Sequence, residues 1–266
     1  MGRKNRLRKP FAGLSALVGL LLVGPATNFL SGCAGNNDWR TATRESAGIA
    51  PPAAAYRDPI VQVYAARAFS WRGAFAVHTW VAVKPRDAAQ YTIYEITGWR
   101  AYRGQSALSI HNGVPDRYWY GAPPEIIAEL SGDGVGGVIE RLDAAARDYP
   151  YRDTYTMWPG PNSNTFTAWV GRAVPELRLD LPPTAIGKDW LDITDGQLIA
   201  KAPSNTGYQF SLFGVLGVLA SVEEGVELNV AGLTLGIDPL DLALKLPGFG
   251  RVGGGNGTAS RAAEPD

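Results

Sequence analysis

Cysteine is nearly absent from this 266-residue chain, which contains only Cys33. A single cysteine excludes a disulfide framework. Histidine is scarce as well, with only His78 and His111. The chain also lacks an excess of charge, since 25 basic residues balance 25 acidic ones; five of the basic residues lie in the first 32 positions, and the rest carries a net charge of −5. This balance does not favour a nucleic-acid partner.

Hydrophobic and aromatic residues are abundant. They make up 45% and 10% of the chain, with eight tryptophans and eleven tyrosines. Such a composition is typical of a globular protein, and the length is sufficient to bury a full core. We expect no organic cofactor and no bound metal.

The first 32 residues have the order of a secretory signal. A basic stretch precedes an apolar run at 11–23, and the chain then reaches Leu30-Ser31-Gly32-Cys33. This string resembles the bacterial lipobox, whose cysteine becomes the lipidated first residue of the mature protein. The alternative is an uncleaved signal anchor. Both interpretations place the protein in the bacterial cell envelope, on the periplasmic face and held to a membrane through its N-terminus.

The remaining chain divides by composition. Residues 33–58 are rich in Ala, Gly and Pro, which predicts a linker that carries the lipid anchor. A folded domain is expected over 59–251, and a disordered tail over 252–266.

Strand patterns dominate the first part of the domain. Segments 60–66, 75–83, 91–99 and 107–111 are rich in β-branched and aromatic residues. His78 lies within the second of these segments. On its own, a strand histidine is more often structural than catalytic, and His111 is interpreted as a solvated turn residue.

The middle of the domain predicts helices and a cleft. We expect a short helix at 123–130, an interhelical turn at the glycine-rich 132–137, and a helix that continues to 147. The aromatic stretch 149–157 is suited to lining a cleft, and 69–72 is a candidate functional loop.

The organising stretch follows at 158–170. A Pro/Gly turn leads into an amphipathic helix with Phe166 and Trp169 on its apolar face, and Pro175 ends the helix. Ser163 or Asn164 is expected to cap the first turn. The N–H groups there can also stabilise an oxyanion.

The string Asn162-Ser163-Asn164-Thr165-Phe166 resembles the Asn-Cys-Asn-x-Phe signature of circularly permuted papain-like enzymes, which include lecithin:retinol acyltransferase-like and NlpC-like amidases and peptidases. The resemblance implies an α+β fold in which an antiparallel sheet packs on the nucleophile helix. It places Ser163 at the position of the nucleophilic cysteine.

The same resemblance assigns the other roles. His78 would be the general base, and Glu95, or next to it Tyr94, would orient the imidazole. The N–H groups of Asn164 and Thr165 would hold the oxyanion at the helix N-terminus. Without catalysis, Ser163 is a residue of a helix cap.

The last third, from about 208 to 251, predicts a β-meander. Its small residues, glycine above all, would permit close packing of the strands. We expect its apolar run at 213–220 to be buried in the sheet, with contact to a membrane or partner as the alternative.

Three strings, at 72–84, 161–166 and 181–189, resemble an uncharacterised bacterial envelope family, the domain of unknown function numbered 3750, from about 47 to 251. Two function classes follow: a serine-dependent amidase, esterase or acyltransferase, or a non-catalytic relative that keeps the cleft. The partner would be a peptidoglycan peptide, a glycan, a lipid or an acyl group.

Overall fold

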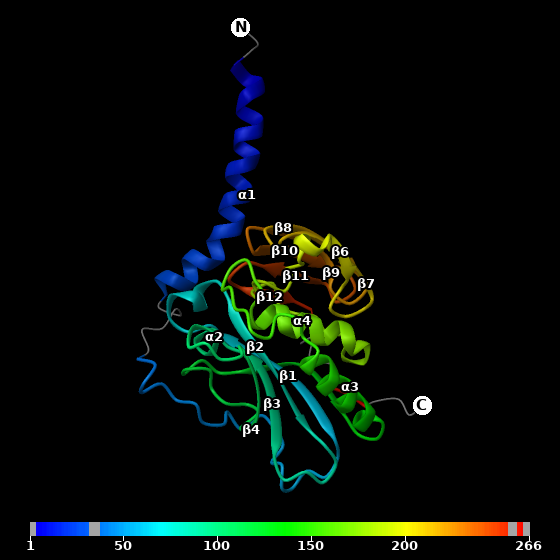
Figure 1. Ribbon diagram of the computed structural model, residues 1–266. Coiled ribbons are helices and arrows are strands. Elements are labelled where there is room, and N and C mark those ends of the chain that lie inside the picture. Colours follow the sequence, from blue (N-terminus) through cyan, green and yellow to red (C-terminus); the bar gives the residue numbers. More distant parts are fainter. Residues whose placement is uncertain (1–3, 32–37, 255–259, 263–266) are drawn as a thin grey trace.

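The computed structural model describes residues 4–31, 38–254 and 260–262. Over these ranges the chain is mixed α+β, with two sheets and a helix, α4, between them (Figure 1). The helices are α1 (Lys4–Leu30), α2 (Gly98–Tyr102), α3 (Val135–Arg147) and α4 (Ser163–Ala173), with short 3-10 turns η1 (Ser70–Ala74), η2 (Pro175–Leu177) and η3 (Ile193–Asp195).

The first sheet has the order β13-β5-β1-β2-β3-β4. Its strands are β1 (Ile60–Arg67), β2 (Val77–Lys84), β3 (Tyr91–Ile96), β4 (Leu108–Gly113), β5 (Glu125–Ser131) and β13 (Ser260–Ala262). All neighbours pair antiparallel except β13, which runs parallel to β5. The four strands predicted from local patterns are therefore present and pair antiparallel. The strand expected over 91–99 is shorter than predicted, because β3 ends at Ile96 and helix α2 begins at Gly98.

Helices α3 and α4 cover one face of this sheet. The core between them contains Val81 of β2, Tyr94 of β3 and Phe166 of α4, all buried. Trp169 was expected to face the sheet, but it is half-buried and its indole donates to Ala145 O of α3 at 2.8 Å. The opposite face of the sheet carries a second apolar cluster around Trp80.

The expected helix at 123–130 is wrong, because this segment forms strand β5. Its backbone pairs with β1 in a register that joins Val61 to Leu130. Sheet pairing thus overrides the helical spacing of its apolar residues. The glycine-rich turn consequently connects a strand to α3, and Gly134 caps that helix with a φ of 88°, a value that glycine adopts without strain. Since β5 is antiparallel to β1, the turn is not part of a dinucleotide-binding unit.

The second sheet is a seven-stranded antiparallel meander, as expected. Its strands are β6 (Ile199–Lys201), β7 (Gly207–Leu212), β8 (Leu216–Ser221), β9 (Gly225–Val230), β10 (Leu233–Asp238), β11 (Ala243–Leu246) and β12 (Gly250–Gly253). The expectation that its apolar run is buried is wrong. Leu216 and Val218 are exposed, whereas Leu219 faces inward.

Charged residues fill the inner side of this meander. Lys245 Nζ lies 2.8 Å from Glu227 Oε1 and 2.5 Å from Asp180 Oδ1. Lys188 pairs with the other oxygen of Glu227. Because Asp180 and Lys188 belong to the segment between the sheets, this buried network fastens the meander to the rest of the domain.

Helix α1 packs against η1 and β10 near its C-terminal end. There Asn28 Nδ2 donates to Gly248 O at 2.7 Å and to Ala74 O at 3.3 Å. Among the described residues, no helix combines the length and apolar character that crossing a bilayer requires. Cys33 lies outside the described residues. The tail was expected to be disordered, but 260–262 form β13.

Candidate functional site

A cavity of about 990 Å³ lies where β2 begins, β3 ends and α4 begins. Both the expected loop at 69–72 and the end of the aromatic stretch 149–157 contribute to it, and Ala231 and Leu233 close it from the β9–β10 turn. Ten aromatic side chains line it: Trp39, Phe69, Trp71, Phe75, Trp99, Tyr102, Trp119, Tyr120, Tyr155 and Trp158. Ser163 and His78 line the same cavity.

The N-cap of α4 is Asn162, and not Ser163 or Asn164 as expected. Its Oδ1 accepts from the N–H of Asn164 at 2.9 Å and of Thr165 at 3.3 Å. Thr165 Oγ1 accepts from the N–H of Asn162 at 3.1 Å, which completes a capping box. The two N–H groups expected to hold an oxyanion are therefore already bonded to Asn162.

Ser163 is the first residue of α4 and only 4% exposed. Its carbonyl accepts from Thr167 Oγ1 at 3.1 Å. Within the described part of the chain its hydroxyl forms no hydrogen bond. The hydroxyl thus lies on the cavity wall at the positive end of the helix dipole, without a partner that would hold it in one orientation.

His78 and Glu95 come together as expected from the strand order. His78 Nε2 lies 3.6 Å from Glu95 Oε2, a charge contact longer than a hydrogen bond. Arg117 donates to the same oxygen at 2.7 Å. The imidazole stacks on Trp119, with the ring centroids 3.7 Å apart. His111 lies on β4, and not in the expected turn, with its Nε2 3.9 Å from Glu95 Oε1.

Burial lowers the pKa of His78, although the neighbouring Glu95 carboxylate opposes this shift. Burial alone would raise the pKa of Glu95, but the contact with His78 and the charge of Arg117 lower it below its ordinary value. The arrangement favours a neutral imidazole beside an ionised carboxylate at neutral pH. A neutral imidazole is the form that can accept a proton.

The structure does not join His78 to Ser163. Thr79 points toward α4, with its Oγ1 2.8 Å from Thr167 Oγ1. Because successive side chains of a strand point to opposite faces, His78 points to the other face, where Trp80 and Trp119 stack around it. The two residues approach the cavity from different sides of β2, and no hydrogen bond connects them.

The charged residues that line the cavity are all cationic. Arg44, Arg72 and Arg103 contribute to its wall, and the described lining residues include no aspartate or glutamate. Arg44 lies over the Tyr120 ring, with its guanidinium carbon 4.4 Å from the ring centroid. The cavity is therefore rich in aromatic residues, and its arginines are its charged lining groups.

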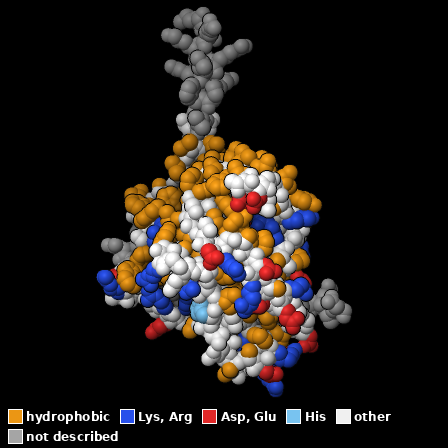
Figure 2. Space-filling view, viewed as in Figure 1, with side chains coloured by type: hydrophobic (Ala, Val, Ile, Leu, Met, Phe, Trp, Pro, Cys, Tyr) orange, Lys and Arg blue, Asp and Glu red, His pale blue; other side chains and the backbone are white. Residues whose placement is uncertain are grey.

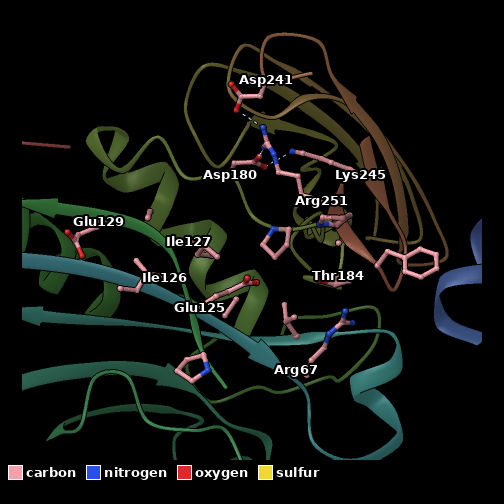
Figure 3. Close-up of a pocket in the computed structure, with 18 of the residues that line it drawn as sticks. Arg67, Glu125, Ile126, Ile127, Glu129, Asp180, Thr184, Asp241, Lys245 and Arg251 are labelled. Carbon is pink, nitrogen blue, oxygen red and sulfur yellow. Dashed lines mark hydrogen bonds and ion pairs between the residues drawn. The ribbon is translucent and has the colours of Figure 1, made fainter. Parts of the chain in front are cut away.

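A second cavity, of about 870 Å³, lies between β5 and the meander (Figure 3). Asp180, Lys245 and Arg251 approach one another on one side of it, and Arg67 and Glu125 lie across from them (Figure 3). Arg251 Nη1 donates to Asp180 Oδ2 at 2.8 Å. Because Asp180, Lys245 and Arg251 already pair with one another, they are less available to a ligand than the arginines of the first cavity. The described residues hold no cluster of His, Cys, Asp and Glu suited to a metal ion.

A comparison with known families matches residues 58–190 to the family described as "Protein of unknown function (DUF3750)". The chain belongs to this family. The match is narrower than the expected 47–251, and it ends before the meander begins. It includes Ser163, His78 and Glu95. No curated protein and no solved structure matches the chain.

Sequence reasoning missed two residues of the site, Arg117 and Trp119. Both belong to the loop between β4 and β5, and both contact the His78–Glu95 pair. The signal is the aromatic and basic run 117–120, which resembles the aromatic stretch 149–157 expected to line a cleft. Nothing in the sequence indicated that this loop returns to β2.

Proposed function

We propose that the domain binds an anionic amphiphile in the aromatic cavity, a molecule with an apolar chain and a phosphate or carboxylate group. The volume of about 990 Å³ is at the upper end of the roughly 300–1,000 Å³ that is usual for small-molecule sites. The aromatic walls supply a large apolar contact area. This is the non-catalytic alternative expected from the sequence, narrowed to one class of ligand.

The choice of an anionic ligand rests on three arginines. Arg44, Arg72 and Arg103 line an otherwise apolar cavity, and no carboxylate among the described lining residues neutralises them. Guanidinium groups bind phosphate and carboxylate through paired hydrogen bonds. A neutral glycan would need more polar partners than these walls offer, and a cationic peptide would be repelled.

Ligand binding can be measured from the fluorescence of the cavity tryptophans. We expect lysophosphatidylglycerol to bind more tightly than lysophosphatidylcholine of the same chain length. Arg72→Met should weaken binding of the anionic lipid by roughly tenfold, the equivalent of one charged hydrogen bond, whereas the exposed Arg86→Met should leave it unchanged. Equal affinity for both lipids in all three proteins would refute the proposal.

A second candidate function is hydrolysis or transfer of an acyl group at Ser163. Two features favour it: the Ser163 hydroxyl has no partner among the described residues, and burial lowers the pKa of His78, which favours the neutral imidazole. In this reaction His78 takes the hydroxyl proton as the oxygen bonds to the acyl carbon, and it passes the proton to the leaving group as the bond from the acyl carbon to that group breaks. Water or an acceptor hydroxyl or amine then attacks the acyl-serine, and His78 takes its proton and returns it to the Ser163 oxygen. Glu95 stabilises the imidazolium. His78 must first turn toward Ser163.

A fluorophosphonate probe distinguishes the two candidate functions. An active serine should be labelled in the wild type and not in Ser163→Ala or His78→Ala. If the protein binds lipid but Ser163 is not labelled, only the binding function remains.

The proposed location is the cell envelope, with the domain held to a membrane through its N-terminus. This rests on the order of basic and apolar residues in the first 32 positions and on the lipobox-like string that ends at Cys33.

A further inference from the structure

The outward side of the meander carries apolar rows, mostly aliphatic, that run across the strands. One row is continuous over six strands, because each residue pairs with the next: Tyr208, Ala220, Val226, Ile237, Leu244 and Val252. A parallel row contains Phe210, Val218 and Leu228. We call these two rows the outer face. At a strand spacing of ~4.8 Å, six strands span roughly 24 Å.

In this sheet the apolar side chains face outward and the charged side chains face inward, the reverse of the usual arrangement. Val226 and Leu228 of β9 point outward, whereas Glu227 between them is buried and pairs with Lys188 and Lys245. An antiparallel sheet with one wet face normally places its polar residues on that face. Because the buried charges are held by one another, the strands cannot turn over to hide the aliphatic rows.

The outer face is exposed over its whole width. Val226, Ile237 and Leu244 are about half exposed, at 49%, 52% and 50%. Figure 2 shows hydrophobic side chains gathered over β8 and β10, at the end of the molecule from which α1 emerges. A contiguous apolar patch of this kind marks an interaction surface.

Helix α1 extends the same apolar surface. Leu20, Leu22 and Val23 are 48%, 45% and 50% exposed. The helix packs on β10 and is fixed by Asn28 to Gly248, which lies in the turn between β11 and β12. The apolar part of α1 and the outer face thus lie at one end of the molecule.

We propose that the outer face docks onto the surface of a lipid bilayer, with its aliphatic side chains among the acyl chains. Its two rows offer no charged group and, apart from the Tyr208 hydroxyl, no side-chain hydrogen-bond partner. A second protein would meet few of the polar contacts that interfaces contain, roughly one hydrogen bond per 100–200 Å², whereas acyl chains need none. At the edge, Lys201 Nζ lies 4.2 Å from the centroid of the Tyr208 ring. A lysine and a tyrosine are suited to the headgroup level.

This proposal does not depend on what the cavity binds. It is tested with the full chain and vesicles of phosphatidylethanolamine and phosphatidylglycerol, by flotation over a range of lipid concentrations. The double variant Val226→Asp with Ile237→Asp should raise the lipid concentration needed for half-binding by tenfold or more, since roughly that factor follows from losing even one buried aliphatic side chain. Val114→Asp, at a valine beside β4 that is 42% exposed, should bind as the wild type does.

A second variant guards against misfolding. Ile237→Ser with Leu244→Ser introduces no charge and should also weaken vesicle binding, with an unchanged circular dichroism spectrum and unfolding midpoint. Binding that is equal in the wild type and both folded double variants would overturn the proposal and assign attachment to α1 alone. A wild-type dimer that both variants dissociate, with vesicle binding unaltered, would also overturn it, because the face would then join two copies of the chain.

Discussion

Thr79 Oγ1 lies 3.0 Å from Oδ1 of Asn164, and this contact determines which side of β2 meets helix α4. Asn164 is fixed further, because its Nδ2 donates to Val77 O at 3.1 Å. With Thr79 directed at the helix, His78 must point to the opposite side. Helix α4 packs on β2, whereas the orientation of His78 does not form a nucleophile–base pair with Ser163.

The first prediction concerns this contact. Thr79→Val keeps the shape of the side chain but removes the hydroxyl that donates to the buried Asn164 Oδ1. We expect a loss of about 1–3 kcal/mol in the free energy of unfolding, the cost of an unsatisfied buried polar group. Urea unfolding measures it. Thr92→Val is the matched control, since its hydroxyl makes a single exposed bond of 3.3 Å; an equal loss in both variants would contradict the assignment.

The second prediction concerns pH. The pKa of His78 is lowered by burial, so below pH about 6.5, the ordinary pKa of histidine, the unfolded chain binds a proton that the folded chain does not. Stability should therefore fall as the pH drops through this range. His78→Gln should flatten that part of the profile, measured by urea unfolding between neutral pH and about pH 5.

A neighbouring carboxylate also bears on this pH profile. The pKa of Glu95 is lowered, so its contribution is present above about pH 4.3 and is lost only as the pH falls further. His111→Gln serves as the control. A profile that His111→Gln flattens and His78→Gln does not would contradict the assignment to His78.

The third prediction concerns the buried ion pairs of the meander. Burial alone would lower the pKa of Lys188, but Asp189 and Glu227 raise it above its ordinary value. Lys188→Met would leave Glu227 with Lys245 as its remaining cation, and we expect a loss of about 3–5 kcal/mol in the free energy of unfolding. The exposed Lys201→Met should change it by less than about 0.5 kcal/mol. A small effect at both positions would show that the network does not hold the meander.

The fourth prediction concerns the anchor. If Cys33 is lipidated, cells should incorporate labelled fatty acid into the protein and lose that label in Cys33→Ala. Ser31→Ala, two residues before it, is the control for expression and export. Label retained in Cys33→Ala would leave the signal anchor as the explanation of membrane attachment.

Local patterns in the sequence were sufficient for much of the fold. The alternation in 91–99 predicts β3, and the spacing of Phe166 and Val170 predicts α4, because each pattern is resolved within one element. Strand β5 was missed for the opposite reason. Its apolar residues, among them Ile126 and Leu130, also fit a helical face, and only the distant pairing with β1 selects the strand.

The sequence predicts which residues belong to the candidate site, but it does not predict how their side chains are oriented. The sequence brings His78 and Glu95 to neighbouring strands, and they do come within 3.6 Å. Which face His78 occupies depends on how β2 meets α4, a relationship between segments about 85 residues apart. The polarity of the meander is similar: alternation separates Val226 from Glu227, but the buried partners Lys188 and Lys245 determine which of the two points inward.

The β9–β10 turn belongs to two surfaces at once. Ala231 and Leu233 close the aromatic cavity, and Leu233 stands at the start of a strand whose later residues form the outer face. With the outer face on a bilayer, this turn would lie next to the membrane, and a ligand that enters the cavity beside it would come directly from the bilayer. Its uptake would then follow its mole fraction in the membrane and be limited by lateral diffusion, and dilution of the vesicles at constant lipid composition would leave the occupancy of membrane-bound protein unchanged.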